Sequence, residues 1–119
     1  MRRRVMIADD HQIVRQGLRA LLEKAGHVVV AEASNGREAV DLAAKQQVDI
    51  AVLDLIMPVL NGVDSARELL RAAPQVRTIL LTMHADRPYV VEALQAGARG
   101  YVLKTQAGPH LWRLSLIHI

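Results

Sequence analysis

Short apolar runs alternate with longer segments of helical periodicity along the whole chain. Each run is too short for a helix and is bounded by polar residues or glycine, which is typical of a strand. The predicted strands are VMIA (5–8), VVVAEA (28–33), IAVLD (50–54), RTILLT (77–82) and GYVLK (100–104).

A helical face follows the first strand, with apolar residues spaced three or four positions apart. Its members are Val14, Leu18, Leu21, Leu22 and Ala25, and Gly26 is a stop signal. The next helix follows the cap-like cluster Ser34-Asn35-Gly36 and carries Ala39, Val40 and Ala43.

Three further helices are predicted from the same kind of signal. Asn61-Gly62 opens a helix whose apolar face holds Val63, Ala66 and Leu70. Pro88 and Gly97 can start and end a fourth helix, and Gly108-Pro109 precedes the beginning of a fifth.

The predicted strands are nearly continuous in Val, Ile, Leu and Ala. Strands of this kind are buried on both faces, as in a parallel sheet that helices cover on its two sides. The helical connections between parallel strands are then expected to be right-handed. The pattern therefore predicts an α/β fold, a doubly wound five-stranded parallel sheet of (βα)5 type.

Composition narrows the class of protein. The chain has 119 residues, of which 51% are hydrophobic and 23% charged, which suits one soluble globular domain. It contains no cysteine, no secretory apolar region and no apolar run long enough to span a bilayer, so we expect a cytoplasmic location without membrane contact. The net charge is +3, but the basic residues are dispersed, which disfavours a DNA-binding face on this segment.

Polar side chains end four of the five predicted strands. They are Asp9 and Asp10 after the first strand, Asp54 after the third, Thr82 after the fourth and Lys104 after the fifth. Because parallel strands all end at one edge of the sheet, where ligands bind, we expect these side chains to lie close together.

Each residue also has a purely structural explanation. Asp10 can serve as an N-cap, Thr82 can reflect β-propensity, and Lys104 can be a solvated surface lysine. Asp54 is harder to explain in this way, because it closes an apolar run where a buried carboxylate needs a partner. Because all five residues are expected at one edge of the sheet, a shared chemical site is a better explanation than five separate structural roles.

The chemistry that suits this set is phosphoryl transfer to a carboxylate. Clustered carboxylates, water and a phosphate oxygen suit Mg²⁺, and one aspartate is then free to act as nucleophile. A lysine and a hydroxyl can contact the transferring group. No phosphate-binding glycine loop, metal-binding histidine spacing or serine nucleophile motif is present. His11 and His84 flank the predicted site, and we interpret both as solvent-facing loop residues that at most tune access to it.

At these residues the chain resembles the receiver domain of bacterial two-component response regulators, in particular the NarL/FixJ branch with its LuxR-type helix-turn-helix output. The matching strings are IADDHQIVRQGLRALL, VAEASNGREAV, DIAVLDLIMP, ILLTMHAD and GARGYVLK, which cover about residues 4 to 113. The resemblance implies a flavodoxin-like strand order of 2-1-3-4-5. It also implies a phosphoacceptor rather than an enzyme in the usual sense.

The resemblance assigns a role to each site residue. Asp54 would accept the phosphoryl group from a phosphohistidine of a sensor histidine kinase. Asp9, Asp10 and Asp54, with the backbone carbonyl of Ile56, would hold Mg²⁺. Lys104 would contact the phosphoryl oxygen, Thr82 would be the switch hydroxyl, and Tyr101 would be the switch aromatic. Phosphorylation would shift the conformation of the domain and favour a homodimer.

One departure from the family lies beside the site. The loop after Pro58 reads Val59-Leu60-Asn61-Gly62, where the family more often has glycine first and aspartate third. Asn61 can still cap the following helix. Val59 removes backbone freedom and could alter the rates of phosphorylation or dephosphorylation.

The end of the chain, LSLIHI, does not continue the family's fifth helix. One spelling of these codons matches a common transposase sequencing-adapter end. We therefore expect a receiver domain at residues 1–113 with an incomplete last helix, a non-native read-through tail at 114–119, and an absent C-terminal DNA-binding domain. The alternative is a natural short C-terminus.

Three other functions stay open from the sequence. The first is an aspartyl-phosphate phosphohydrolase of the HAD type, although its D-x-D-x-[TV] motif is not matched by Asp9-Asp10-His11. The second is a stand-alone receiver that acts through protein–protein contacts. The third is a flavodoxin-like nucleotide-binding protein, which the lack of a phosphate loop disfavours.

Overall fold

The computed structural model describes residues 2–54, 59–82, 95, 97 and 100–103. Its elements are β1 (Arg4–Ala8), α1 (Gln12–Lys24), β2 (Val28–Ala33), α2 (Gly36–Lys45), β3 (Ile50–Asp54), α3 (Gly62–Ala72), β4 (Arg77–Thr82) and β5 (Gly100–Leu103). The helices predicted after Pro88 and after Gly108-Pro109 lie outside the described residues.

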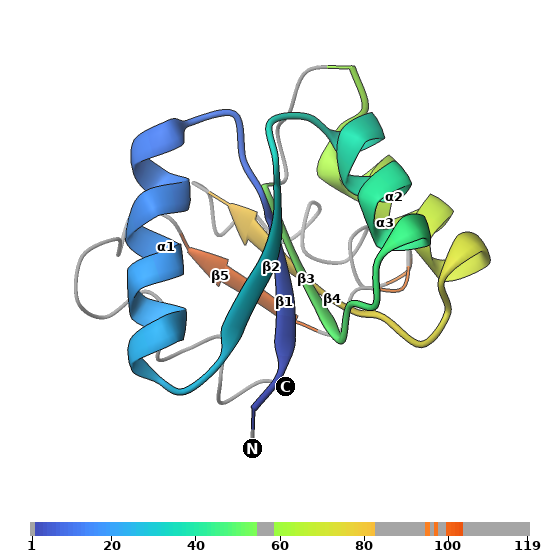
Figure 1. Cartoon of the computed structure of the whole chain (residues 1–119). Coiled ribbons are helices and arrows are strands. Elements are labelled where there is room, and N and C mark those ends of the chain that lie inside the picture. The colour runs from blue at the N-terminus through green and yellow to red at the C-terminus, as the bar shows by residue number, and fades with distance from the viewer. Residues whose placement is uncertain (1, 55–58, 83–94, 96, 98–99, 104–119) are drawn as a thin grey trace.

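The strands form one parallel sheet in the order β2-β1-β3-β4-β5 (Figure 1). This is the order that the resemblance implied. Strand β1 lies between β2 and β3, and the pairing of Ala8 with Leu53 brings the carboxyl ends of β1 and β3 to the same level. Asp9, which follows β1, and Asp54, the last residue of β3, therefore lie at one edge of the sheet.

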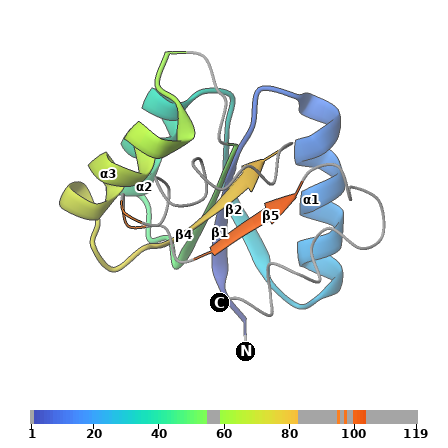
Figure 2. The ribbon, with the colours of Figure 1, turned by 180° about the vertical axis from the view of Figure 1, so that it is seen from behind.

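Helices cover both faces of the sheet, as the apolar strands predicted. Figures 1 and 2 show α1 on one face, and α2 with α3 on the other. Alternate residues of β1 enter separate cores: Val5 and Ile7 pack with the α1 residues Leu18 and Leu22, whereas Met6 packs on the opposite side. All the described β1 residues after Arg4 are fully buried, which leaves the strand no polar position until it ends.

Two of the predicted helix starts are confirmed in atomic detail. The side chain of Asn35 accepts a hydrogen bond of 2.8 Å from the backbone N–H of Glu38, and that of Asn61 accepts one of 2.9 Å from Asp64. Each satisfies a backbone donor that the first turn of a helix leaves without an intrahelical acceptor. The predicted stop at Gly26 is also confirmed, since this residue follows α1 with a φ of 95°.

The predictions for Asp10 and Leu70 are corrected by the structure. The N-cap residue of α1 is His11, without a side-chain cap hydrogen bond, so Asp10 is not the cap. On α3 the buried apolar residues are Val63, Ala66 and Leu69, while Leu70 is exposed. Leu70 lies about 100° further round the helix than Leu69, and α3 turns its Leu69 side inward because it packs on α2 as well as on the sheet.

The predicted face of α1 also includes Ala25, which is exposed as the C-cap residue of the helix.

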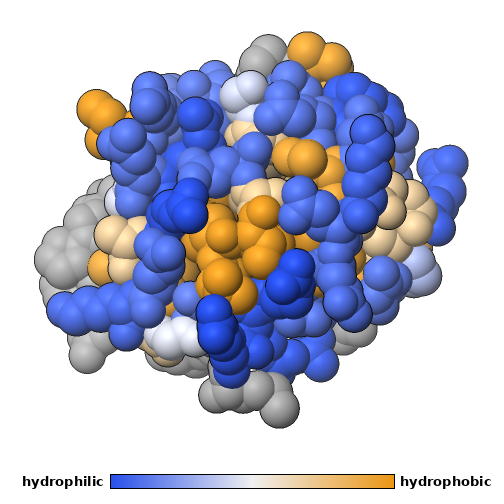
Figure 3. Space-filling view, in the orientation of Figure 1, coloured by the Kyte–Doolittle hydropathy of each residue, from blue (hydrophilic) through white to orange (hydrophobic). Residues whose placement is uncertain are grey.

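Strand β2 is less buried than β1 or β3, because it is an outer strand of the sheet with a neighbour on one side. Its half-buried residues include Val28, Val30 and Ala31, and Figure 3 shows hydrophobic atoms gathered over this strand between charged side chains. No helix in the described part of the chain is long and apolar enough to cross a membrane.

Candidate metal centre

Two buried aspartates lie side by side where β1 and β3 end. Asp54 is the last residue of β3 and is 4% exposed, and Asp9 follows β1 with no exposed surface. The backbone N–H of Asp9 donates a hydrogen bond of 3.0 Å to the carbonyl of Ala33, which continues the ladder between β1 and β2. Main-chain pairing thus holds both carboxylates at the carboxyl edge of the sheet.

Asp10 and His11 complete a cluster of four side chains with these two aspartates. Asp9, Asp10, His11 and Asp54 each offer one potential ligand atom, and these atoms all lie within 4.8 Å of one another. Asp10 and His11 are exposed, so the cluster opens to solvent on their side. The sequence predicted the convergence of the three aspartates at this edge, and the structure confirms it.

The donor set fits a divalent cation. Three carboxylates at this spacing repel one another, and a bound cation would compensate their charge. Magnesium prefers oxygen ligands, of which one or two protein carboxylates with water and a phosphate oxygen are sufficient. Asp9, Asp10 and Asp54 are the described residues that could hold such an ion.

His11 lies closer to the acidic pair than its sequence context indicated. Its Nδ1 lies 2.9 Å from Oδ1 of Asp9 and 3.1 Å from Oδ1 of Asp10. Its backbone N–H also donates to Oδ1 of Asp9 at 2.8 Å. The side chain is 64% exposed, as predicted for a solvent-facing residue, but it contacts two carboxylates of the site rather than only flanking them.

The side chain of Arg15 on α1 contacts the backbone of Asp9, after the end of β1. Its Nη1 donates a hydrogen bond of 2.5 Å to the backbone carbonyl of Asp9, and its Nε lies 3.4 Å from Oε1 of Glu32 on β2. Arg19 donates to the other oxygen of Glu32 at 2.7 Å. Sequence reasoning missed Arg15; the available signal was a basic residue one helical turn after His11.

The remaining predicted site residues are described only in part or not at all. Lys104, Ile56 and His84 lie outside the described residues. Thr82 ends β4 and pairs with Leu103, and Tyr101 pairs with Leu80, but the side chains of Thr82 and Tyr101 lie outside what the structure describes. Asp54 pairs with Leu81, so the backbone of Thr82 is at the same edge of the sheet as the aspartates.

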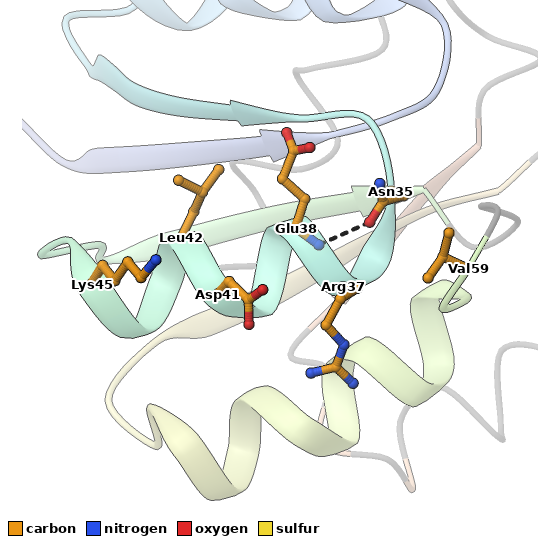
Figure 4. A pocket seen from close by; sticks show the side chains of 7 residues that line it. All are labelled: Asn35, Arg37, Glu38, Asp41, Leu42, Lys45 and Val59. Carbon is orange, nitrogen blue, oxygen red and sulfur yellow. Dashed lines mark hydrogen bonds between the residues drawn. The ribbon is translucent and has the colours of Figure 1, made fainter.

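A hollow lies beside α2, and none of its lining residues belongs to the acidic cluster. It has a volume of about 430 Å³, and its lining residues are Asn35, Arg37, Glu38, Asp41, Leu42, Lys45 and Val59 (Figure 4). Arg37 also donates to both carboxylate oxygens of Glu68 on α3, and this hydrogen bond raises the pKa of Arg37. The hollow carries both signs of charge and shares no residue with the metal centre, so we give it no part in the chemistry.

Comparison with known proteins agrees with this geometry. The family model for the response regulator receiver domain matches residues 5–114. The transcriptional regulatory protein DegU of Brevibacillus brevis is 39% identical over 101 residues, which are 84% of this chain and 43% of that protein. The chain therefore spans less than half the length of this relative.

Two other relatives are matched over most of their length. The chemotaxis protein CheY of Thermotoga maritima is 36% identical over 87% of this chain and 87% of its own length. A crystal structure of a two-component response regulator of the LuxR family from Aurantimonas sp. SI85-9A1 superposes with a TM-score of 0.89 at 36% identity, covering 99% of this chain and 86% of that one. With its parallel sheet, its acidic cluster and a family match over nearly the whole sequence, the chain belongs to the response regulator receiver domain family, whose members are phosphoacceptors rather than enzymes of the usual kind.

Proposed function

We propose that Asp54 is the phosphoacceptor of this receiver domain. A carboxylate oxygen of Asp54 attacks the phosphorus of a phosphohistidine on a sensor histidine kinase, and the P–N bond breaks with its electrons returning to the imidazole. The product is an acyl phosphate on Asp54. The observation that carries this assignment is the clustering of Asp54 with Asp9 and Asp10 at the carboxyl edge of the sheet.

Asp9, Asp10 and Asp54, together with the backbone carbonyl of Ile56, are proposed to hold Mg²⁺. When bound, the ion neutralises charge on the transferring phosphoryl group. Asp9 and Asp10 do not accept the phosphoryl group themselves in this proposal. Their different burial suits different tasks: buried Asp9 is part of the scaffold of the site, and exposed Asp10 lies on its solvent side.

The proposed response to phosphorylation of Asp54 involves Lys104, Thr82 and Tyr101. Phosphorylation exchanges one negative charge for about two and adds acceptor oxygens. Lys104 contacts a phosphoryl oxygen and Thr82 donates its hydroxyl to another, after which Tyr101 turns inward. The phosphorylated state thereby shifts the population of two surfaces that exist beforehand and favours a homodimer.

The output proposed for the intact protein is transcriptional control through a helix-turn-helix domain. DegU, which is named as a transcriptional regulatory protein, supports this, as does the LuxR-family structure. We place the receiver domain at residues 1–113, treat 114–119 as a non-native tail, and assign DNA contact to a separate C-terminal domain. Sequencing the source locus beyond Arg113 tests this division. In this proposal the protein acts in the cytoplasm.

A stand-alone receiver is the second candidate. The match to CheY over 87% of that protein's length favours it, since CheY is similar to this chain over nearly its entire extent. Genomic sequence after Arg113 separates the candidates: a downstream helix-turn-helix supports transcriptional output, and an early stop codon supports the stand-alone form.

Phosphorylation with acetyl phosphate and Mg²⁺ tests the central assignment. We expect a mass increase of one phosphoryl group on the wild type and none on Asp54→Asn. Asp41→Asn is the matched control, because Asp41 is exposed on α2 outside the cluster. Uptake by Asp54→Asn at the wild-type rate would refute the assignment, and rapid turnover of small phosphomonoesters by the wild type would support the aspartyl-phosphate hydrolase instead.

A further inference from the structure

The imidazole of His11 occupies a defined place against the acidic pair. Its Nδ1 is within hydrogen-bond distance of one carboxylate oxygen of Asp9 and one of Asp10. The main chain fixes the residue on both sides: its N–H donates to Asp9, and its carbonyl accepts a hydrogen bond of 3.1 Å from the N–H of Arg15. The ring is therefore held at the cluster by its backbone, although most of its surface is exposed.

The spacing of these atoms suits ligands of one metal ion. In an octahedral site with ligands at about 2.1 Å, neighbouring ligand atoms lie about 3.0 Å apart. Nδ1 of His11 lies 2.9 Å and 3.1 Å from the nearest oxygens of Asp9 and Asp10. The potential ligand atoms of these residues and of Asp54 span no more than 4.8 Å.

An imidazole nitrogen changes which metals such a site prefers. Carboxylates, carbonyls and water suit Mg²⁺, whereas imidazole favours later first-row ions such as Co²⁺ and Ni²⁺. To bind a metal, Nδ1 would give its lone pair to the ion while the neutral ring carries its proton on Nε2. An oxygen-only site would lack this contribution.

We propose that His11 is a fourth protein ligand of the metal centre and determines its metal specificity, so that the site binds Co²⁺ and Ni²⁺ through His11 but Mg²⁺ through the carboxylates. This inference rests on the proposed metal centre, and it concerns a residue outside the oxygen ligand set. The exposed side chain can make the contact without rearrangement of the core.

Calorimetric titration of the 119-residue chain with Mg²⁺ and with Ni²⁺, at one fixed pH, tests the proposal. In His11→Ala and His11→Gln we expect the Ni²⁺ affinity to fall about tenfold or more and the Mg²⁺ affinity to change by less than about threefold. His27→Ala is the matched control, because His27 directly precedes β2 and so lies at the amino ends of the strands, whereas the metal centre lies at their carboxyl ends. It should leave both affinities unchanged.

Pulsed electron paramagnetic resonance supplies a readout independent of affinity. Co²⁺ bound to the wild type should show coupling to a ¹⁴N nucleus of imidazole, and His11→Ala should lose that coupling. An unchanged ratio of Ni²⁺ to Mg²⁺ affinity in both His11 variants, or nitrogen coupling that survives in His11→Ala, would overturn the proposal.

The outcomes also separate this inference from the proposed function. If Asp54 is phosphorylated with Mg²⁺ but the His11 variants keep the wild-type metal preference, the role of His11 alone is wrong. If the chain neither binds Mg²⁺ nor takes up a phosphoryl group, both the proposed function and this inference are wrong.

Discussion

The backbone carbonyl of Leu60 lies directly against the α-carbon of Gly36. A Cβ atom on Gly36 would be 1.8 Å from the Leu60 oxygen and 2.2 Å from Oγ of Ser65. Ser65 is fully buried and its hydroxyl donates to the same carbonyl at 3.4 Å. The backbone at Leu60 thus packs directly on the first residue of α2, and this contact joins the start of α2 to the start of α3.

Gly36→Ala should destabilise the domain. The new methyl group meets backbone rather than a flexible side chain, so the loop must move, and overpacking of this kind costs about 1–3 kcal/mol in the free energy of unfolding. Gly17→Ala on α1 is the matched control: nothing lies within 4 Å of its Cβ, and the higher helix propensity of alanine should stabilise the protein by about 0.5–1 kcal/mol. Urea denaturation measures both, and equal midpoints would contradict the close contact.

Val59→Gly should stabilise the domain. Val59 has a φ of 69°, a left-handed conformation that is costly for a β-branched residue, and its side chain is 79% exposed. Relief of the strain is worth about 1–2 kcal/mol, from which the greater entropy of glycine in the unfolded chain subtracts about 0.4–1 kcal/mol. We expect a net gain of roughly 0.5–1 kcal/mol by urea denaturation.

Val59→Ala is the control for the Val59 prediction, because alanine keeps a Cβ in the same left-handed backbone. It should recover less stability than glycine. A loss of stability in Val59→Gly would show that the strain is smaller than the entropy term. If the relieved loop also changes the rate of phosphorylation, the departure from the family's glycine bears on the chemistry as the sequence suggested.

His27 should make stability depend on pH. Burial lowers the pKa of His27 below its ordinary value of 6.5, and the positive charges of the chain's amino terminus and Arg3 lower it further. The unfolded chain then binds more protons near this value than the folded protein does. Stability therefore rises with pH through the window below 6.5 and falls as the solution is acidified.

Urea midpoints measured across this window for the wild type and His27→Gln isolate the contribution of His27. The two curves should converge above the ordinary histidine pKa and separate below it, with the wild type losing more stability on acidification. Parallel curves would contradict the prediction. The hydrogen bond that Nδ1 of His27 accepts from the N–H of Arg3 favours the neutral ring, so it acts in the same direction as burial. The effect should still be modest, because His27 is only partly buried.

Magnesium should stabilise the wild type against urea. An ion that binds only the folded state at about 100 times its dissociation constant adds about 2.7 kcal/mol to the free energy of unfolding. Asp10→Ala and Asp54→Asn should lose most of this gain. Because Asp10 is exposed and does not cap α1, and because its removal relieves repulsion from Asp9 and Asp54, its replacement should not lower the stability of the metal-free protein.

Asp9→Ala should behave differently from Asp10→Ala. The carboxylate of Asp9 is buried and accepts a hydrogen bond from the backbone of His11, so its loss should lower stability even without metal, by about 1–3 kcal/mol. Identical behaviour of the two variants in metal-free urea titrations would show that burial does not distinguish their roles.

Much of the fold could be predicted from local patterns. Apolar runs bounded by polar residues located β1 to β5, and Asn35 and Asn61 were recognisable as caps because capping acts within three residues. The error at Leu70 has a tertiary cause: periodicity defines a helix face only to within about one residue, and packing on α2 selected Leu69.

The sequence by itself determined which carboxylates meet, since a parallel sheet brings the carboxyl ends of its strands to one edge. Asp9 and Asp10 come directly after such an end, and Asp54 is the last residue of β3. Only the tertiary structure decided how they are held. Three contacts depend on the path of the loops in three dimensions. His11 contacts two carboxylates, Arg15 donates a hydrogen bond to the carbonyl of Asp9, and Leu60 packs on Gly36. A side chain's partners across such loops are set by distance in space, which neither periodicity nor residue type encodes.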